Sequence, residues 1–82
     1  MKLMDCVEVA AEKNEYAKEG VHKGMQGVIW EPKCKDGCWV VLIPQYGEKE
    51  DIADLYICEE DLRLIPVIDA KVNERIREEF GE

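Results

Sequence analysis

The chain contains no serine and no threonine among its 82 residues. This absence excludes nucleophilic catalysis by either residue and removes every site of serine or threonine phosphorylation. It also leaves aspartate, asparagine and glycine as the residues that can cap helices.

Histidine is almost as scarce, because His22 is the single example. A cysteine nucleophile needs a base within hydrogen-bonding distance, and nothing in the sequence places His22 beside a thiol. His22 stands in a glycine-rich segment, so we expect it to be exposed to solvent. Carboxylates are abundant, but paired catalytic acids need a cleft that separates their pKa values. The sequence therefore predicts no enzymatic activity and no cofactor.

Long apolar runs are also missing. The first five residues turn polar at once, unlike a secretory signal, and no run approaches the length that crosses a bilayer. We therefore expect a cytoplasmic protein that does not associate with membranes. Its four cysteines are then expected to be reduced.

Charge is abundant and uneven. The formal net charge is −8, with 11 basic and 19 acidic residues. Residues 1–47 carry six bases and seven acids, whereas residues 48–82 carry five bases and twelve acids. Such an acidic half repels phosphate backbones, which disfavours nucleic acid as a partner. It can attract a basic protein surface instead, or it can serve solubility alone.

The apolar pattern predicts one domain made mainly of short strands. The predicted strands span residues 3–10, 25–31, 38–43, 52–58 and 62–65. Prolines end three of them, because proline cannot donate to a strand ladder. The Asp36–Gly37 pair predicts a hairpin turn. Residues 11–24 form a long connection, with at most a short helical turn, and residues 45–50 form a loop. We expect Val7, Val9, Leu55 and Ile57 in the core.

The end of the chain predicts a helix. Apolar residues recur every fourth position from Val72 to Phe80, Asp69 is a fair N-cap, and Gly81 is a reasonable stop. The apolar stripe is narrow, so the helix needs a neighbour. We expect it to cover the outward face of the second to fourth strands, where we place Ile29 and part of Val40 and Leu42. Packing on a second copy of the chain is the alternative.

The order of these elements resembles the Src-homology-3-like barrels. Residues 23–29 (KGMQGVI) resemble a KOW-type segment, and the wider string from residue 3 to 65 resembles small bacterial proteins of unknown function that share this barrel. That string includes the Asp-Gly-Cys-Trp hairpin from Asp36, the Gly47-Glu48 segment and the Glu60-Asp61-Leu62 triplet. The resemblance implies a small all-β barrel of about five antiparallel strands over residues 1–66, with the C-terminal α-helix within 67–82. Some members of the broad group bind ribosomal or messenger RNA.

The cysteines are expected to be structural. Cys34 and Cys38 flank a three-residue turn and should lie opposite each other within disulfide range. Cys6 and Cys58 lie on separate strands that can approach each other. The spacing of the four does not match a two-knuckle zinc site. We therefore expect reduced thiols without a metal, with a labile 34–38 disulfide and a Cys₄ zinc site as alternatives.

Two tryptophans and an acidic stretch are the candidate binding residues. Trp30 and Trp39 lie on neighbouring strands and should pack as a cross-strand pair, either in the core or as an aromatic face for peptide docking. The acids from Asp51 to Asp61 form either a solvated rim or one patch that docks a basic partner.

These features predict a non-enzymatic module that engages a basic protein through an acidic face, in an immunity- or antitoxin-like role as one version. The predicted protein-binding residues are Trp30, Trp39, Asp51, Asp54, Tyr56, Glu59, Glu60 and Asp61. One alternative is a KOW-like RNA- or ribosome-associated module, which would use the bases Lys13, Lys18, Lys23, Lys33 and Lys35. The other is a structural domain that self-associates through its helix or an open strand edge.

Overall fold

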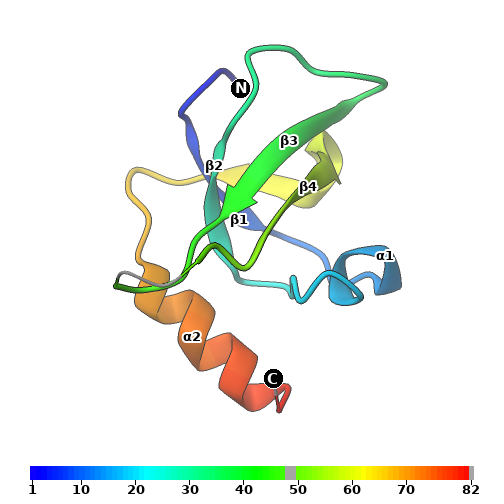
Figure 1. Ribbon diagram of the computed structural model, residues 1–82. Helices are drawn as coiled ribbons and strands as arrows, with labels where there is room; N and C mark the ends of the chain where they lie inside the picture. The colour runs from blue at the N-terminus through cyan, green and yellow to red at the C-terminus, as the bar shows by residue number, and fades with distance from the viewer. Residues whose placement is uncertain (48–49, 82) are drawn as a thin grey trace.

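A computed structural model describes residues 1–47 and 50–81 and shows a small, mostly β fold (Figure 1). Five antiparallel strands form one curled sheet in the order β4-β3-β2-β1-β5. The strands are β1 (Cys6–Val9), β2 (Gln26–Ile29), β3 (Cys38–Ile43), β4 (Ala53–Cys58) and β5 (Leu62–Leu64). The helices are α1 (Asn14–Ala17), the 3₁₀ turn η1 (Glu59–Asp61) and α2 (Ala70–Glu79). The predicted five antiparallel strands and C-terminal helix are thus confirmed.

Each predicted strand forms, and the differences lie at the ends. The strand predicted over 38–43 has those bounds, whereas the ones predicted over 3–10 and 25–31 are shorter. The predicted loop over 45–50 includes residues 48 and 49, and the predicted C-terminal segment includes residue 82; these three lie outside the described residues. Among the residues that are described, no helix is long and apolar enough to cross a membrane.

The hairpin turn predicted at Asp36–Gly37 is confirmed. Both residues have positive φ, 52° and 78°, as a two-residue type I′ turn requires. The flanking residues Lys35 and Cys38 exchange both backbone hydrogen bonds, at 2.8 and 2.9 Å. The turn thus fixes where β3 begins.

The core lies on the concave side of the sheet. Alternation along β3 buries Val41 and Ile43 against Val7, Val9 and other fully buried apolar side chains. Ile57 is buried, and Leu55 packs partly buried against the same cluster, as predicted.

The outward placement of Ile29 is wrong. Ile29 is fully buried and belongs to the core cluster, so the core side of β2 is the opposite of the expected one. The register explains the difference, because Ile29 pairs with the inward-facing Val41 of β3. Sequence alternation shows that Ile29 and Trp30 point to opposite sides, but it does not say which side is the core.

The connection between β1 and β2 contains the short helix α1, which buries Tyr16. The expectation that His22 is exposed is wrong: it is 4% exposed. Its Nδ1 lies 2.8 Å from Glu12 Oε2, and its ring stacks on Phe80 with 3.7 Å between centroids. The end of α2 therefore closes over this connection.

Helix α2 packs within the chain, but not where we expected. Its N-cap is Asp69, whose side chain accepts from the Lys71 N–H, as predicted. Ile76 packs against the core cluster and lies beside Gly24. The helix contacts the start of β2 and lies beyond the end of the sheet (Figure 1). The predicted cover over the outward face of the sheet is therefore wrong.

Candidate functional site

The convex side of the sheet carries an exposed apolar surface over β2, β3 and β4. Val40 of β3 lies opposite Tyr56 of β4, and its carbonyl accepts the Trp30 N–H at 2.9 Å. Trp30, Val40 and Tyr56 therefore form one cross-strand row. The next row joins Val28, Leu42 and Asp54. We call these six residues the outer face: Val28, Trp30, Val40, Leu42, Asp54 and Tyr56.

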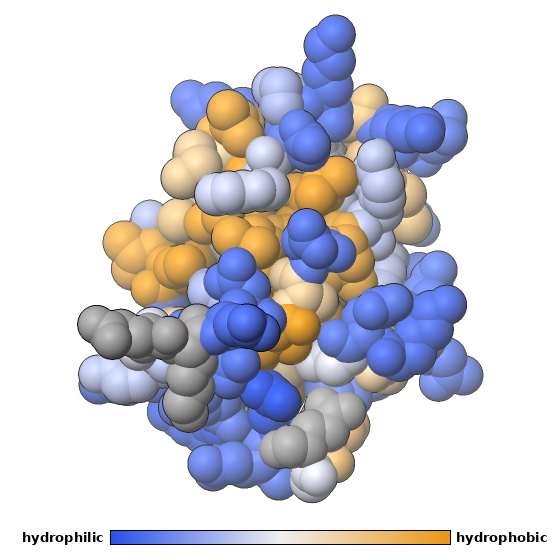
Figure 2. Space-filling model, in the orientation of Figure 1, coloured by the Kyte–Doolittle hydropathy of each residue, from blue (hydrophilic) through white to orange (hydrophobic). Residues whose placement is uncertain are grey.

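The outer face is open to solvent. Trp30 is 47% exposed and Tyr56 is 53% exposed. Figure 2 shows a hydrophobic area in the middle of the molecule, over β3, with hydrophilic side chains around it. Because α2 lies beyond the end of the sheet, no helix within residues 1–47 and 50–81 covers these rows.

An open hollow of about 420 Å³ adjoins the aromatic row. It is lined by Glu31, Pro32, Lys33, Cys34, Lys35, Val40 and Tyr56. Sequence reasoning missed this hollow, although it placed part of Val40 on the outward face of the sheet. The available signal was the strand over 38–43, whose two faces are both apolar although only one face packs in the core.

The two tryptophans do not form the predicted pair. Trp30 lies opposite Val40, so it is out of register with Trp39. Trp39 points to the core side, is 7% exposed, and donates its Nε1–H to Glu59 Oε1 at 3.0 Å. Of the two, only Trp30 lies on the outer face.

The predicted acidic residues separate into two groups and a buried residue. Asp51 and Asp54 are exposed at the start of β4, whereas Glu59 and Glu60 are exposed at its far end, about 15 Å away along the strand. The placement of Asp61 in a solvated rim is wrong, because Asp61 is 6% exposed. The structure therefore brings Asp54, Trp30 and Tyr56 together on one face and leaves the η1 acids apart.

Asp61 is held in the interior by two partners. The Tyr16 hydroxyl donates to Asp61 Oδ2 at 2.7 Å, and Lys13 Nζ lies 2.7 Å from the same oxygen. The Lys13 ammonium, bonded to the carboxylate, lowers the pKa of Asp61. Burial and the bond to Asp61 raise the pKa of Tyr16. Tyr16 also accepts the Cys58 N–H at 3.2 Å, so the group ties α1 to the β4–η1 corner.

Acid is expected to destabilise the protein partly through Asp61. Because Lys13 holds the pKa of Asp61 below its ordinary value of 3.8, the unfolded chain binds this proton more readily. The stabilisation is therefore full above about pH 4 and is lost as pH falls through the folded-state pKa. We expect Asp61→Asn to lower Tm at pH 7 and to reduce the further loss of Tm between about pH 5 and pH 2, measured by circular dichroism.

The exposed Asp54 provides the matched control for this titration. Asp54→Asn should keep the native loss of Tm in acid. An acid loss in Asp61→Asn as large as in the native protein would contradict the assignment.

The cysteine neighbours differ from those expected. Cys38 lies opposite Cys58 in the β3–β4 ladder, and their Sγ atoms are 3.1 Å apart. Cys34 is exposed, and the bridge across the turn joins Lys35, not Cys34, to Cys38. Cys6 on β1 is separated from Cys58 on β4 by two strands. The expectation that Cys34 lies opposite Cys38 is therefore wrong.

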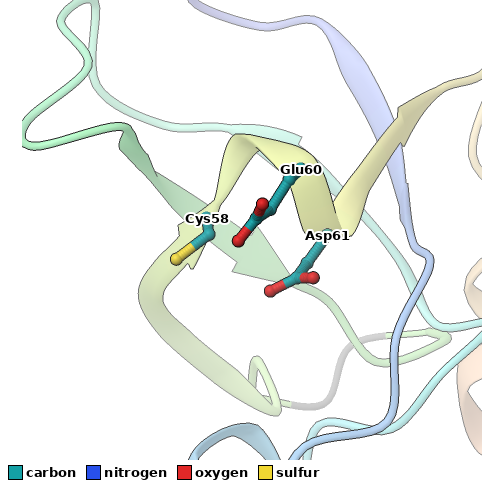
Figure 3. Close-up of side chains that lie close together, drawn as sticks. All are labelled: Cys58, Glu60 and Asp61. Carbon is teal, nitrogen blue, oxygen red and sulfur yellow. The ribbon is translucent and has the colours of Figure 1, made fainter.

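One group of three potential metal ligands lies close together among residues 1–47 and 50–81. Donor atoms of Cys58, Glu60 and Asp61 fall within 4.8 Å of one another at the β4–η1 corner (Figure 3). Asp61 Oδ2 already faces the Lys13 ammonium and the Tyr16 hydroxyl. Since that ammonium balances the charge of the buried carboxylate, the arrangement is explained without a metal.

No protein-family model matches the chain, and comparison with curated proteins and with solved structures finds none that matches it.

Proposed function

We propose that the protein is a non-enzymatic binding module that engages a basic segment of a partner protein through its outer face. The observation that carries the proposal is the exposed Trp30–Val40–Tyr56 row beside a hollow of about 420 Å³. Exposed tryptophan and tyrosine on a rigid sheet are typical of binding hot spots.

The chemistry of the outer face suits a cationic side chain flanked by apolar ones. A guanidinium group stacks favourably on tyrosine or tryptophan rings, and Asp54, two residues from Tyr56 on the same face, offers it a carboxylate. The net charge of −8 speeds the approach of a basic partner. Lys33 and Lys35 line the hollow, so we expect the partner to place an apolar side chain there and its cations toward Asp54.

We also propose that the fold is a Src-homology-3-like barrel. Three features support this class: the last strand pairs with the first, a long connection joins β1 to β2, and one 3₁₀ turn precedes β5. An immunity- or antitoxin-like role, masking a cationic nucleic-acid-cleaving toxin, is the most concrete version of the proposal. It rests on the small size and the acidic charge.

A pull-down with matched variants tests the docking surface. The tagged protein is incubated with lysate of the source organism, with and without nuclease, and retained proteins are quantified by mass spectrometry. We expect a basic protein to be retained both with and without nuclease. Tyr56→Ala should reduce its capture about tenfold, which corresponds to roughly 1.4 kcal/mol, because it removes half of the aromatic row.

Tyr46 is the matched control, since it is 50% exposed and lies outside the outer face. Tyr46→Ala should leave capture within about twofold of the native level. Equal capture by both variants would reject the outer face as the docking surface. Retention of ribosomal proteins that disappears on nuclease treatment would favour the RNA-associated alternative.

A further inference from the structure

Cys38 and Cys58 face each other at the end of the β3–β4 ladder. They are directly paired in the register, and their Sγ atoms lie 3.1 Å apart. Directly opposed residues in an antiparallel ladder have Cα separations that fall within the range of disulfides. Backbone geometry therefore permits a bond between these two cysteines without a change of register.

The hydrogen bonds around the pair identify its type. The Cys38 N–H donates to the Lys35 carbonyl within the turn, and the Glu59 N–H donates to the Gly37 carbonyl. The flanking 37–59 pair is thus hydrogen-bonded, so the 38–58 pair is the non-hydrogen-bonded kind, in which opposed side chains approach most closely.

The pair is accessible to a small reagent. Both cysteines are half-buried, and a hollow of about 240 Å³ opens beside Cys38. That hollow is lined by Lys35, Asp36, Cys38 and Tyr56. The Lys35 ammonium offers a counter-ion for a carboxylate, which a peptide disulfide such as oxidised glutathione carries.

We propose that Cys38 and Cys58 are a modification site that forms a reversible disulfide by exchange with a low-molecular-weight disulfide of the glutathione type. One thiolate of the pair attacks a sulfur of the oxidised reagent, which forms a mixed disulfide and releases one reduced thiol. The second cysteine, after its proton passes to solvent, attacks the protein sulfur of the mixed disulfide and releases the second reduced thiol. Two cysteine thiols are oxidised and one reagent disulfide is reduced. This inference does not rest on the proposed function.

The reaction is expected to be slow at neutral pH. The S–H···S hydrogen bond with Cys58, together with burial, raises the pKa of the Cys38 thiol to about 11. Cys34 and Asp36 act in the same direction. Lys35 lines the adjoining hollow, and Glu60 and Asp61 lie beside Cys58. Exchange proceeds through the thiolate, so its rate should rise steadily from pH 7 to about pH 10.

The disulfide is expected to stabilise the fold. It closes the loop that includes β3 and β4 and so reduces the conformational freedom of the unfolded chain. For a domain of this size, we expect Tm to rise by about 10 °C on oxidation.

The test uses oxidised glutathione at about pH 8.5 on the full-length Cys34→Ala variant, which keeps the pair and removes the exposed thiol. We expect an intact mass lower by two hydrogen atoms, a 38–58 cross-link in peptide mapping, and the rise in Tm, all reversed by a dithiol reductant. Cys34→Ala/Cys58→Ala should instead accumulate a stable glutathione adduct on Cys38, because no second thiol resolves it.

Three outcomes with the Cys34→Ala variant would overturn the proposal. They are a mixed adduct that persists in Cys34→Ala, a cross-link of Cys38 to Cys6 instead of Cys58, and unchanged free thiols in protein whose circular dichroism shows it to be folded. In the native chain, a cross-link between Cys34 and Cys38 would also count against it.

Discussion

Replacing Asn73 with alanine is expected to lower the free energy of unfolding by about 3 kcal/mol. Asn73 is fully buried, and its carboxamide joins Gln26 of β2 to Pro44, which directly follows β3. It accepts the Gln26 N–H at 2.7 Å and donates to the carbonyls of Gln26 and Pro44 at 2.8 and 2.9 Å. Alanine would leave these backbone groups without partners, and the penalty for such buried groups exceeds the value of an ordinary hydrogen bond.

The register explains why an asparagine is needed there. Continuing the β2–β3 pairing beyond Val28 and Leu42 places Gln26 opposite Pro44. Proline has no N–H, so it cannot bond to the Gln26 carbonyl. The Asn73 amide supplies that donor and at the same time fixes α2 to the end of the sheet.

Chemical denaturation with urea measures this effect. Arg75→Ala is the matched control, because Arg75 lies two residues away on the exposed side of the same helix. Arg75→Ala should change the free energy of unfolding by no more than about 0.5 kcal/mol. A domain of this size has a total free energy of unfolding of about 4 to 12 kcal/mol. The loss expected for Asn73→Ala is a large fraction of that value and is therefore easily measured. A change below about 1 kcal/mol in Asn73→Ala would contradict the bridging role.

Gly27→Ala is expected to be comparably severe. A Cβ at this position would lie 2.3 Å from the Leu42 carbonyl oxygen and 2.9 Å from Ile43 Cδ1. The first contact is with backbone of the paired strand, which cannot rotate away as a side chain can. We expect a loss of about 3 kcal/mol, because β2 and β3 must separate to admit the methyl group.

Gly37→Ala separates this steric effect from the general cost of losing a glycine. Gly37 has a φ of 78°, but open space surrounds its Cβ position. Its replacement should cost about 1 kcal/mol from backbone strain alone. In thermal unfolding, the Tm of Gly27→Ala should therefore be clearly lower than the Tm of Gly37→Ala. Equal Tm values would show that the sheet tolerates a wider spacing at Gly27.

The strands and turns could be predicted from sequence because their signals are local. The continuous apolar run Cys38–Ile43, the Asp36–Gly37 turn and the Asp69 cap each depend on residues close in the chain. The face that each strand buries depends on pairing with another strand. That is why Ile29 was placed on the wrong side although its alternation with Trp30 was correct.

The site could be predicted only in part. Exposed aromatic and acidic residues identified Trp30, Tyr56 and Asp54, and the register brings these three to one face. The same choice of aromatic and acidic residues also included Trp39 and Asp61. These two side chains are buried by partners that are distant in sequence. A carboxylate held by a tyrosine and a lysine about 45 positions away has no local signature.

The predicted pairing of Cys34 with Cys38 is wrong for a related reason. Spacing favoured Cys34 and Cys38, because they flank a turn. The two-residue turn, however, consists of Asp36 and Gly37 and pairs Cys38 with Lys35. The thiol neighbour of Cys38 is then decided by the β3–β4 register, across twenty residues of sequence.

The most direct test of the docking surface is the fluorescence of Trp30 in a Trp39→Phe variant, in which Trp30 is the single tryptophan. In the free protein its emission should be that of a half-exposed indole, since Trp30 is 47% exposed. On addition of the captured basic protein, the emission should shift to shorter wavelengths and become protected from acrylamide, and raised salt should weaken both effects. If emission and quenching stay unchanged at saturating partner, the outer face is not the surface through which this protein binds.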